Sequence, residues 1–214
     1  MRKKYIILLL AMLGFSMGIE AKSINTYGFT IGAGQTREFY IYMNTTRNNL
    51  VSFQIDLKMP KGLTVNIDKC LLPSRVTDTE QQLYVGLVGN NLYRLVSTSF
   101  NFKPLPMENA PLVKVSVTAD ETFQGGTVNL VDMFTVTTNG DKVPWISDSF
   151  EVVKGNNIKG DANYDGIVSV TDLMQIVGYA LGQDGLYSSS YDVDLNGLVD
   201  VVDVMIVSDT LLGK

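Results

Sequence analysis

A twelve-residue pattern occurs twice near the C-terminus and constrains the fold of this region more than any other feature of the chain. The copies span residues 161–172 and 192–203, so they begin 31 residues apart. Each has glycine at position 6, where the backbone must turn sharply. Side chains that carry oxygen occupy positions 1, 3, 5, 9 and 12: Asp161, Asn163, Asp165, Ser169 and Asp172 in the first copy, and Asp192, Asp194, Asn196, Asp200 and Asp203 in the second. Two unrelated Asp/Asn/Gly turns are the simpler alternative, and the repetition argues against them.

This order of oxygens is the one with which an EF-hand loop wraps a calcium ion, and the carbonyl of position 7 supplies a further ligand. Position 7 is Ile167 in the first copy and Leu198 in the second. Both copies have Asp at position 12, where most EF-hands have Glu, and no long amphipathic helix precedes either copy. An apolar helical pattern follows each copy and stops at Gly182 or Gly213. Each unit is therefore predicted to be a loop followed by one helix.

Loop, helix, stop and duplication together resemble a type I dockerin over residues 158–214. The resemblance implies a small module that folds around two calcium ions and docks to a cohesin partner. By position, it implies these calcium ligands: Asp161, Asn163, Asp165, the Ile167 carbonyl, Ser169 and Asp172, then Asp192, Asp194, Asn196, the Leu198 carbonyl, Asp200 and Asp203. Partner contacts are implied at loop positions 10 and 11, which are Val170, Thr171, Val201 and Val202. Clostridial dockerins commonly have Ser-Thr there and a basic pair later in the helix, which this chain lacks, so we expect a different and more apolar interface.

Charge is divided unevenly along the chain. Residues 155–214 contain nine Asp, no Glu, no Arg and two Lys, a net charge of −7, whereas residues 22–154 have twelve basic and twelve acidic side chains. Clustered aspartates repel one another unless a cation lies among them. An acidic tail is the alternative, but the Val, Leu, Ile and Met content of this segment predicts a folded core. The acidic balance gives no support to nucleic-acid binding.

The first 21 residues read as a secretory signal peptide. A basic start is followed by an apolar run too short for a comfortable membrane span and by a small residue, Ala21, suited to cleavage before Lys22. A signal anchor is the alternative. No other segment could cross a membrane as a helix, so we expect a protein that is extracellular, at the cell surface or periplasmic. Cys70 is the only cysteine, so no disulfide can form within one chain.

Residues 24–153 show the alternation of β-strands. In residues 50–59, Val51, Phe53, Ile55, Leu57 and Met59 alternate with polar side chains, so one face is apolar. Residues 38–43 and 113–118 alternate in the same way, and further strands are expected at 27–31, 63–67, 83–89, 92–99, 127–136 and 147–153. Short strands at this spacing predict an antiparallel β-sandwich. The fold class expected for the chain is mainly β, with a small helical calcium-binding module after the sandwich.

This region resembles the cohesin-like β-sandwich, which is close to some carbohydrate-binding modules. The resemblance rests on residues 50–63, a strand ending in a Pro-x-Gly-Leu turn, and on residues 112–120 followed by 125–130. The expected organisation is a signal peptide at 1–21, a sandwich at 22–153 and a calcium module at 154–214. Residues 153–159 form a short link without a long Pro/Thr or Gly/Ser tether, so we expect the modules to lie close together. A freely swivelling tail is the alternative.

Several kinds of catalytic site are excluded. The chain has no His and one Cys, which rules out Ser-His-Asp and Cys-His nucleophiles, His-bound metals and thiolate zinc sites. No phosphate-binding loop of the Gly-x-x-x-x-Gly-Lys type is present. A glycosidase needs only two carboxylates, but the acidic residues of the sandwich form no recognisable pair. The sequence therefore predicts a protein that is not an enzyme.

Two aromatic features remain open. Tyr40 and Tyr42 share the polar side of one strand, where they could stack against sugar rings or pack under a neighbouring segment. Trp145, the only Trp, lies near the end of the sandwich region and is expected to be a buried anchor between the modules.

Taken together, the chain is predicted to be a secreted, non-catalytic binding protein. A calcium-dependent docking module would follow a sandwich, in an assembly that handles polysaccharide outside the cell, and the partner would be a cohesin-like domain of this or another chain. Two alternatives stay open. In one, the protein is a carbohydrate-binding module whose calcium loops are only structural. In the other, the sandwich caps its own helical module.

Overall fold

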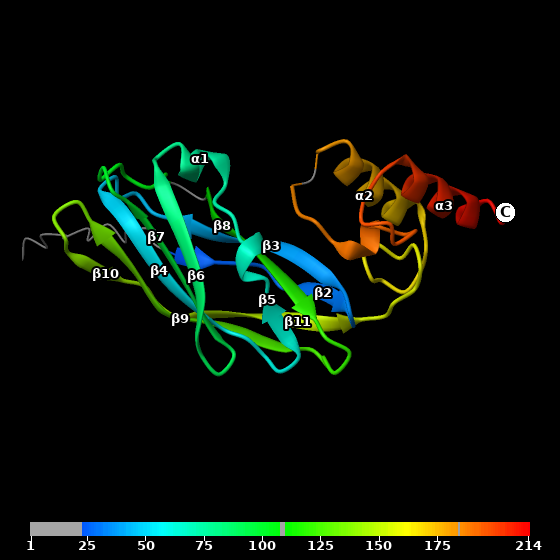
Figure 1. Cartoon of the computed structure of the whole chain (residues 1–214), viewed down its shortest axis with the longest axis horizontal. Helices are drawn as coiled ribbons and strands as arrows, with labels where there is room; N and C mark the ends of the chain where they lie inside the picture. Colours follow the sequence, from blue (N-terminus) through cyan, green and yellow to red (C-terminus); the bar gives the residue numbers. More distant parts are fainter. Residues whose placement is uncertain (1–22, 108–109, 184) are drawn as a thin grey trace, which may run out of the picture.

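The computed structural model describes residues 23–107, 110–183 and 185–214. The predicted signal peptide at 1–21 lies outside the described residues. Two packed sheets form one half of the molecule, and two helices with their loops form the other half (Figure 1). Within the described residues, no helix is long and apolar enough to cross a bilayer.

The two sheets face each other around one apolar core. The smaller sheet has the order β1-β3-β8-β5, made of β1 (Ser23–Asn25), β3 (Thr36–Asn44), β8 (Ala110–Ala119) and β5 (Leu63–Val65). The larger has the order β2-β11-β9-β4-β7-β6, made of β2 (Phe29–Gly32), β11 (Asp148–Gly155), β9 (Gly126–Thr137), β4 (Leu50–Lys58), β7 (Leu92–Ser99) and β6 (Gln81–Gly89). A short strand, β10 (Lys142–Pro144), pairs with β9. The core takes side chains from both sheets, which makes the sandwich a single packed unit.

Period-two alternation explains which side chains fill this core. Along β4, Phe53, Ile55 and Leu57 are fully buried between the sheets, because alternate residues of a strand point to the same face. β4 lies between β7 and β9, so its backbone pairs on both sides. All the strands expected from alternation are present, with shifted ends.

The prediction of a purely antiparallel sandwich is wrong at one edge. β11 runs parallel to β2, with Val152 opposite Phe29 and Gly155 opposite Gly32. Alternation could not reveal this, since side chains alternate with the same period in parallel and antiparallel strands. The sequence also missed the three-residue strands β1 and β10, the short helix α1 (Ser74–Thr77) and the 3₁₀ turn η1 (Ile67–Lys69), which are too short for a periodic signal.

The prediction for Trp145 is also wrong. Its side chain is buried in the sandwich core, and its indole Nε1 donates to the Thr135 hydroxyl at 3.0 Å. Trp145 follows β10, and the whole of β11 then carries the chain toward the helical half (Figure 1). Closeness to the junction in sequence therefore did not mean closeness in space.

Two units, each a loop followed by a helix, make up the second half and share a core of their own. The helices are α2 (Val170–Ala180) and α3 (Val201–Leu211), and a 3₁₀ turn, η2 (Ser189–Tyr191), precedes the second loop. Ile176 of α2 and Val207 of α3 are fully buried in this second core. A glycine with positive φ follows the end of each helix, Gly182 at 71° and Gly213 at 70°. As predicted, a single helix follows each loop.

The structure gives a direct prediction for the lone cysteine. Cys70 is buried in the sandwich, and this burial raises the pKa of its thiol. The protonated thiol is therefore favoured in the folded protein, and the stability it contributes is lost as the pH rises through the raised pKa. We expect an aromatic disulfide reagent at mildly alkaline pH to label Cys70 about tenfold or more slowly than in the guanidinium-unfolded chain, because only an accessible thiolate reacts. Equal labelling rates would show that Cys70 is exposed.

Candidate functional site

The first carboxylate of each loop organises the same turn. Asp161 accepts hydrogen bonds from the backbone N–H groups of Asp165 at 3.1 Å and Gly166 at 2.9 Å. In the second loop, Asp192 accepts the equivalent bonds from Asn196 at 3.0 Å and Gly197 at 2.8 Å. Both aspartates are buried. The two loops therefore share one geometry, as the repeated sequence predicts.

The last carboxylate of each loop closes the ring from the helix. Asp172 accepts backbone hydrogen bonds from Asn163 at 3.0 Å and Ser169 at 2.8 Å. Asp203 accepts from Val193 at 2.6 Å, Asp194 at 3.2 Å and Asp200 at 2.9 Å. Both carboxylates are 0% exposed. Position 12 thus joins the start of each loop to the first turn of its helix.

Backbone conformations with positive φ at positions 4 and 6 let the loop fold back on itself. Tyr164 and Leu195, at position 4, have φ of 64° and 62°. Gly166 and Gly197, at position 6, have φ of 94° and 90°, a region that glycine adopts without a steric penalty. Residues other than glycine rarely adopt positive φ. Because Tyr164 and Leu195 both do so at the same loop position, this conformation is a shared feature of the two loops, of the kind found at functional sites.

Three carboxylates converge in the second loop. Carboxylate oxygens of Asp192, Asp194 and Asp203 lie within 4.8 Å of one another. The first loop has the neutral amide of Asn163 where the second has Asp194. The remaining predicted ligands lie on the same loops: Asp165 and Asn196 accept from the N–H groups of Ile167 and Leu198, while Ser169 and Asp200 cap α2 and α3.

The buried carboxylates of the loops form no ion pair within the part of the chain that the structure describes, although Lys159 lines the same cavity as Asp161 and Asp192. Among the ion pairs of the described residues, none includes Asp161, Asp172, Asp192 or Asp203. Burying a carboxylate is costly unless it is paired or coordinates a metal. Hard oxygen ligands in this number and geometry fit calcium. The donor set of each loop therefore suits a calcium ion.

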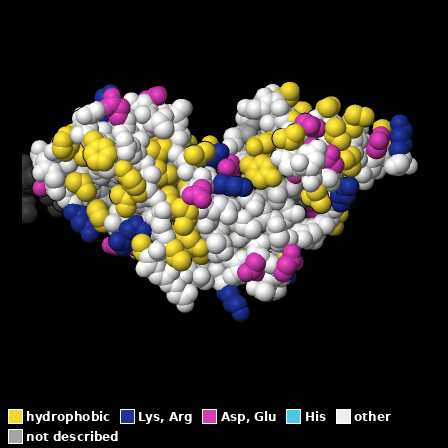
Figure 2. All heavy atoms as spheres, in the orientation of Figure 1, with side chains coloured by type: hydrophobic (Ala, Val, Ile, Leu, Met, Phe, Trp, Pro, Cys, Tyr) yellow, Lys and Arg dark blue, Asp and Glu magenta, His cyan; other side chains and the backbone are white. Residues whose placement is uncertain are grey.

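The residues predicted to contact a partner are exposed. Val170 and Val201, the first residues of α2 and α3, are 64% and 66% exposed, and Val202 is 43% exposed; Thr171 is exposed as well. Beside them an apolar groove of about 350 Å³ runs between the end of α2 and the start of α3. Its lining is Val177, Ala180, Leu181, Val199, Asp200, Val201 and Val204. Hydrophobic side chains are visible over this half of the molecule in Figure 2.

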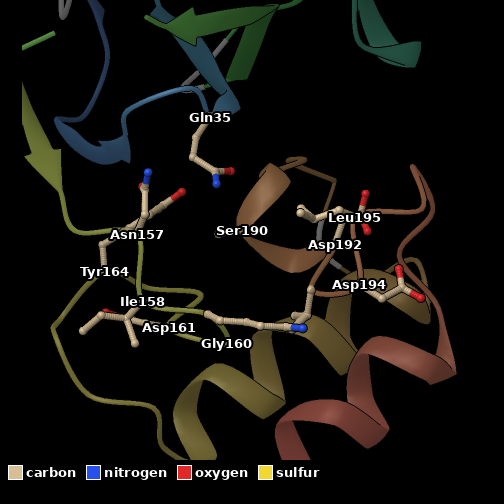
Figure 3. Close-up of a pocket in the computed structure, with 12 residues that line it drawn as sticks. Gln35, Asn157, Ile158, Gly160, Asp161, Tyr164, Ser190, Asp192, Asp194 and Leu195 are labelled. Carbon is tan, nitrogen blue, oxygen red and sulfur yellow. The ribbon is translucent and has the colours of Figure 1, made fainter. Parts of the chain in front are cut away.

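A cavity of about 300 Å³ lies between the two halves of the molecule. It lies between Gln35 of the sandwich, Asn157 of the link and the start of both loops, including Asp161 and Asp192 (Figure 3). The Asn157 amide donates to the Ala33 carbonyl at 2.8 Å and so ties the link to the turn before β3. The first aspartate of each loop therefore faces the sandwich side of the helical half.

Solved structures share the fold of the sandwich. The structure of CaCohA2 from Clostridium acetobutylicum matches with a TM-score of 0.53 and 11% identity, over 63% of this chain and 91% of that one. The sandwich has a cohesin-like fold. A type I cohesin–dockerin complex of OlpA and Doc918 from Clostridium thermocellum matches at 0.50, with 8% identity, over 62% of this chain and 99% of that one.

A third match is the sixth cohesin of scaffoldin B from Acetivibrio cellulolyticus, solved in complex with a Cel5 dockerin. It has a TM-score of 0.50 and 7% identity, over 62% of this chain and 99% of that one. Identities this low show the fold alone. No protein-family model matches the sequence, and the search of curated proteins finds no match.

Carboxylates of the cohesin-like sandwich are engaged in ion pairs between strands. Asp56 on β4 is buried and receives two hydrogen bonds from the Arg94 guanidinium on β7, at 2.8 and 2.7 Å. Glu38 on β3 pairs with Lys114 on β8 at 2.8 Å. Each carboxylate is neutralised by a cation, an arrangement that suits structure better than acid–base chemistry.

Tyr40 and Tyr42 do not form a flat platform. Their ring planes meet at 68°, and the ring of Tyr27 meets that of Tyr42 at 67°. Burial raises the pKa of Tyr42, with Tyr27 and Tyr40 adding to the effect. Edge-to-face rings present no common surface on which a sugar ring could lie.

Sequence reasoning missed the residues that join the two halves. Segment 186–189 contacts β3 through Tyr187 and Ser189, and no motif marked it. A run of serines at 188–190 was the one visible sign, and alone it predicts only a loop.

Proposed function

We propose that residues 154–214 form a module that folds around two calcium ions. One observation carries this proposal: equivalent positions of two loops hold buried carboxylates, Asp161 and Asp172 in one and Asp192 and Asp203 in the other, and none of them forms an ion pair among the described residues. When bound, each ion supplies the positive charge that these carboxylates lack. The proposed ligands are the side chains at positions 1, 3, 5, 9 and 12 and the carbonyls of Ile167 and Leu198.

We further propose that this module is a docking module of the dockerin type and that its partner is a domain with the cohesin fold. Support comes from the exposed valines at the start of both helices and from the apolar groove beside them. Contiguous apolar surface on a small domain is typical of a protein-binding face. Two of the solved structures similar to this sandwich are cohesins in complex with dockerins, which suggests the class of partner.

Two other readings have less support. A sugar-binding role for Tyr40 and Tyr42 is disfavoured by their crossed ring planes. In the second alternative, the sandwich would cover the docking face of its own module. This is disfavoured because Val170, Val201 and Val202 remain exposed. The binding role is therefore proposed to be directed outward, in a secreted, non-catalytic protein of an extracellular assembly.

The docking face can be tested with one double variant. Val201→Asp together with Val202→Asp is expected to weaken partner capture about tenfold or more, because charges would be buried at the centre of the interface. The measurement is capture of cohesin-fold proteins from the secreted fraction of the source organism by the tagged full chain, with calcium and with chelator.

The control is Ile146→Asp, which adds one such charge at an apolar residue of the sandwich that is 90% exposed. Capture that requires calcium and survives Ile146→Asp but not the double variant supports the proposal. Undiminished capture by the double variant would move the docking face elsewhere, and recovery of no cohesin-fold protein would remove the proposed partner.

A further inference from the structure

Segment 186–189 of the helical module lies along the edge of β3 and forms an isolated β-bridge with it. An antiparallel bridge joins Arg37 to Ser188. The Glu38 N–H donates to the Tyr187 carbonyl at 2.8 Å, and the Tyr187 N–H donates to the Glu38 carboxylate at 3.0 Å. β1 pairs with the other end of β3, at 42–44, so the two segments divide this edge between them. Strand addition at a free edge is a common mode of binding.

Side chains reinforce this seam, by which we mean the contact between segment 186–189 and β3. The Thr36 N–H donates to the Ser189 hydroxyl at 2.9 Å, and that hydroxyl also bonds to the Gln35 side chain. Glu38 holds Lys114 in an ion pair whose side chains are only 11% and 19% exposed. The seam is therefore built from specific polar contacts, which demand one orientation of the two halves.

The seam leads into the second calcium loop without a spacer. Ser188 caps the η2 turn, Ser190 donates from its hydroxyl to the Ala162 carbonyl of the first loop at 3.1 Å, and Tyr191 packs in the helical core. Asp192, the first proposed ligand of the second loop, is the next residue. Five consecutive residues, 188–192, thus touch the sandwich, both loops and the module core. Figure 3 shows this meeting point, with Gln35 on one side and Asp192 on the other.

We propose that the seam is linked to metal binding: segment 186–189 pairs with the β3 edge when calcium occupies the loops, and it leaves that edge when the ions are removed. The proposal rests on the proposed function, since it requires ions in the loops. Without them, repulsion between the aspartates loosens the loops, and residues 188–192 lose the fixed geometry that aligns Tyr187 with Glu38. The partner of this surface is the chain's own sandwich.

Linkage of this kind works in both directions. If calcium favours the seam, the seam must favour calcium by the same factor. The helical module is then held in one orientation in which Val201 stays exposed, and no residue of segment 186–189 lines the groove. Holding the docking face in one pose lowers the entropic cost of binding an outside partner.

Hydrogen exchange in the full chain tests the linkage. We expect chelation to speed exchange at the Glu38 amide about tenfold or more, because its acceptor is the Tyr187 carbonyl. Amides of the central strand β4, at Phe53 and Ile55, serve as the internal control and are expected to keep their protection. Calorimetric titration of the same protein reports calcium uptake independently.

A pair of variants tests the reverse direction. Glu38→Gln removes the ion pair and weakens one seam bond, because a neutral amide oxygen is a poorer acceptor for the Tyr187 N–H than a carboxylate, and it is expected to weaken calcium affinity about fivefold or more. Glu80→Gln is the matched control, because Glu80 is also paired with a lysine, Lys103, but has no contact with the helical module among its hydrogen bonds. Its calcium affinity is expected to equal that of the unmodified protein.

The outcomes separate the two proposals. Calcium uptake with faster exchange at Glu38 after chelation supports the linkage, even if Glu38→Gln fails to fold. Calcium uptake with unchanged exchange at Glu38 overturns the linkage and leaves the proposed function standing. The absence of calcium uptake overturns both.

Discussion

Chelation of calcium is expected to unfold residues 158–214 and to leave the sandwich folded. Four buried carboxylates in the loops form no ion pair among the residues that the structure describes, so we expect the folded module to depend on the ions. The sandwich has its own core, to which α2 and α3 contribute no side chain. Far-ultraviolet circular dichroism should therefore lose nearly all of its helical signal on chelation, while the thermal transition of the β structure remains.

Readdition of calcium should restore the helical signal, and magnesium at the same concentration should not. Magnesium is smaller, demands near-octahedral geometry and usually keeps several waters, so a cage of six protein oxygens is expected to hold it less well than calcium. An unchanged helical signal in protein verified to be free of metal would contradict the dependence on ions. Recovery with magnesium would contradict the assignment of the loops to calcium.

Replacing the fully buried carboxylate of the second loop should destabilise the module more than any other single change in it. Asp203 accepts three backbone hydrogen bonds, from Val193, Asp194 and Asp200, and is also a proposed ligand. Asp203→Ala leaves these donors without their acceptor, and each unsatisfied buried group costs about 1–3 kcal/mol. We expect a loss of about 3 kcal/mol or more in the free energy of unfolding of the module, and the loss of one bound ion.

The matched control is Asp209→Ala, which removes an aspartate from the exposed side of the same helix. Its effect is expected to stay within about 0.5 kcal/mol, as for most surface substitutions. Urea unfolding in calcium, followed by the helical signal, gives both values, and calorimetry counts the ions. Similar unfolding midpoints for the two variants would show that Asp203 does not close the loop as its hydrogen bonds indicate.

Local patterns carried much of the prediction. The oxygen positions of the loops, the helix after each loop and the stops at Gly182 and Gly213 all depend on residues a few positions apart, and the structure has each of these features. Even the capping role of position 9 follows from local chemistry, because Ser169 and Asp200 stand directly before the first helical residue. Whether ions occupy the loops stays a prediction.

Local sequence patterns did not predict the direction of the strands or which strands pair with each other. Alternation located β4 and β3 because burial on one face repeats every second residue. It could not show that β11 runs parallel to β2, nor that Trp145 lies in the sandwich core rather than at the junction. Both facts depend on the path of the whole chain between distant segments.

The sequence by itself determined the elements of this protein: two oxygen-rich loops, the helix behind each loop, and strands with one apolar face. These follow from backbone geometry and side-chain chemistry over short stretches. Tertiary structure alone decided how the halves meet, since Glu38 and Tyr187 are 149 residues apart and bond only after the sandwich and the second loop have each taken shape. A strand edge offers the same backbone groups to any segment, so the partner that fills it is selected by geometry that no local pattern encodes.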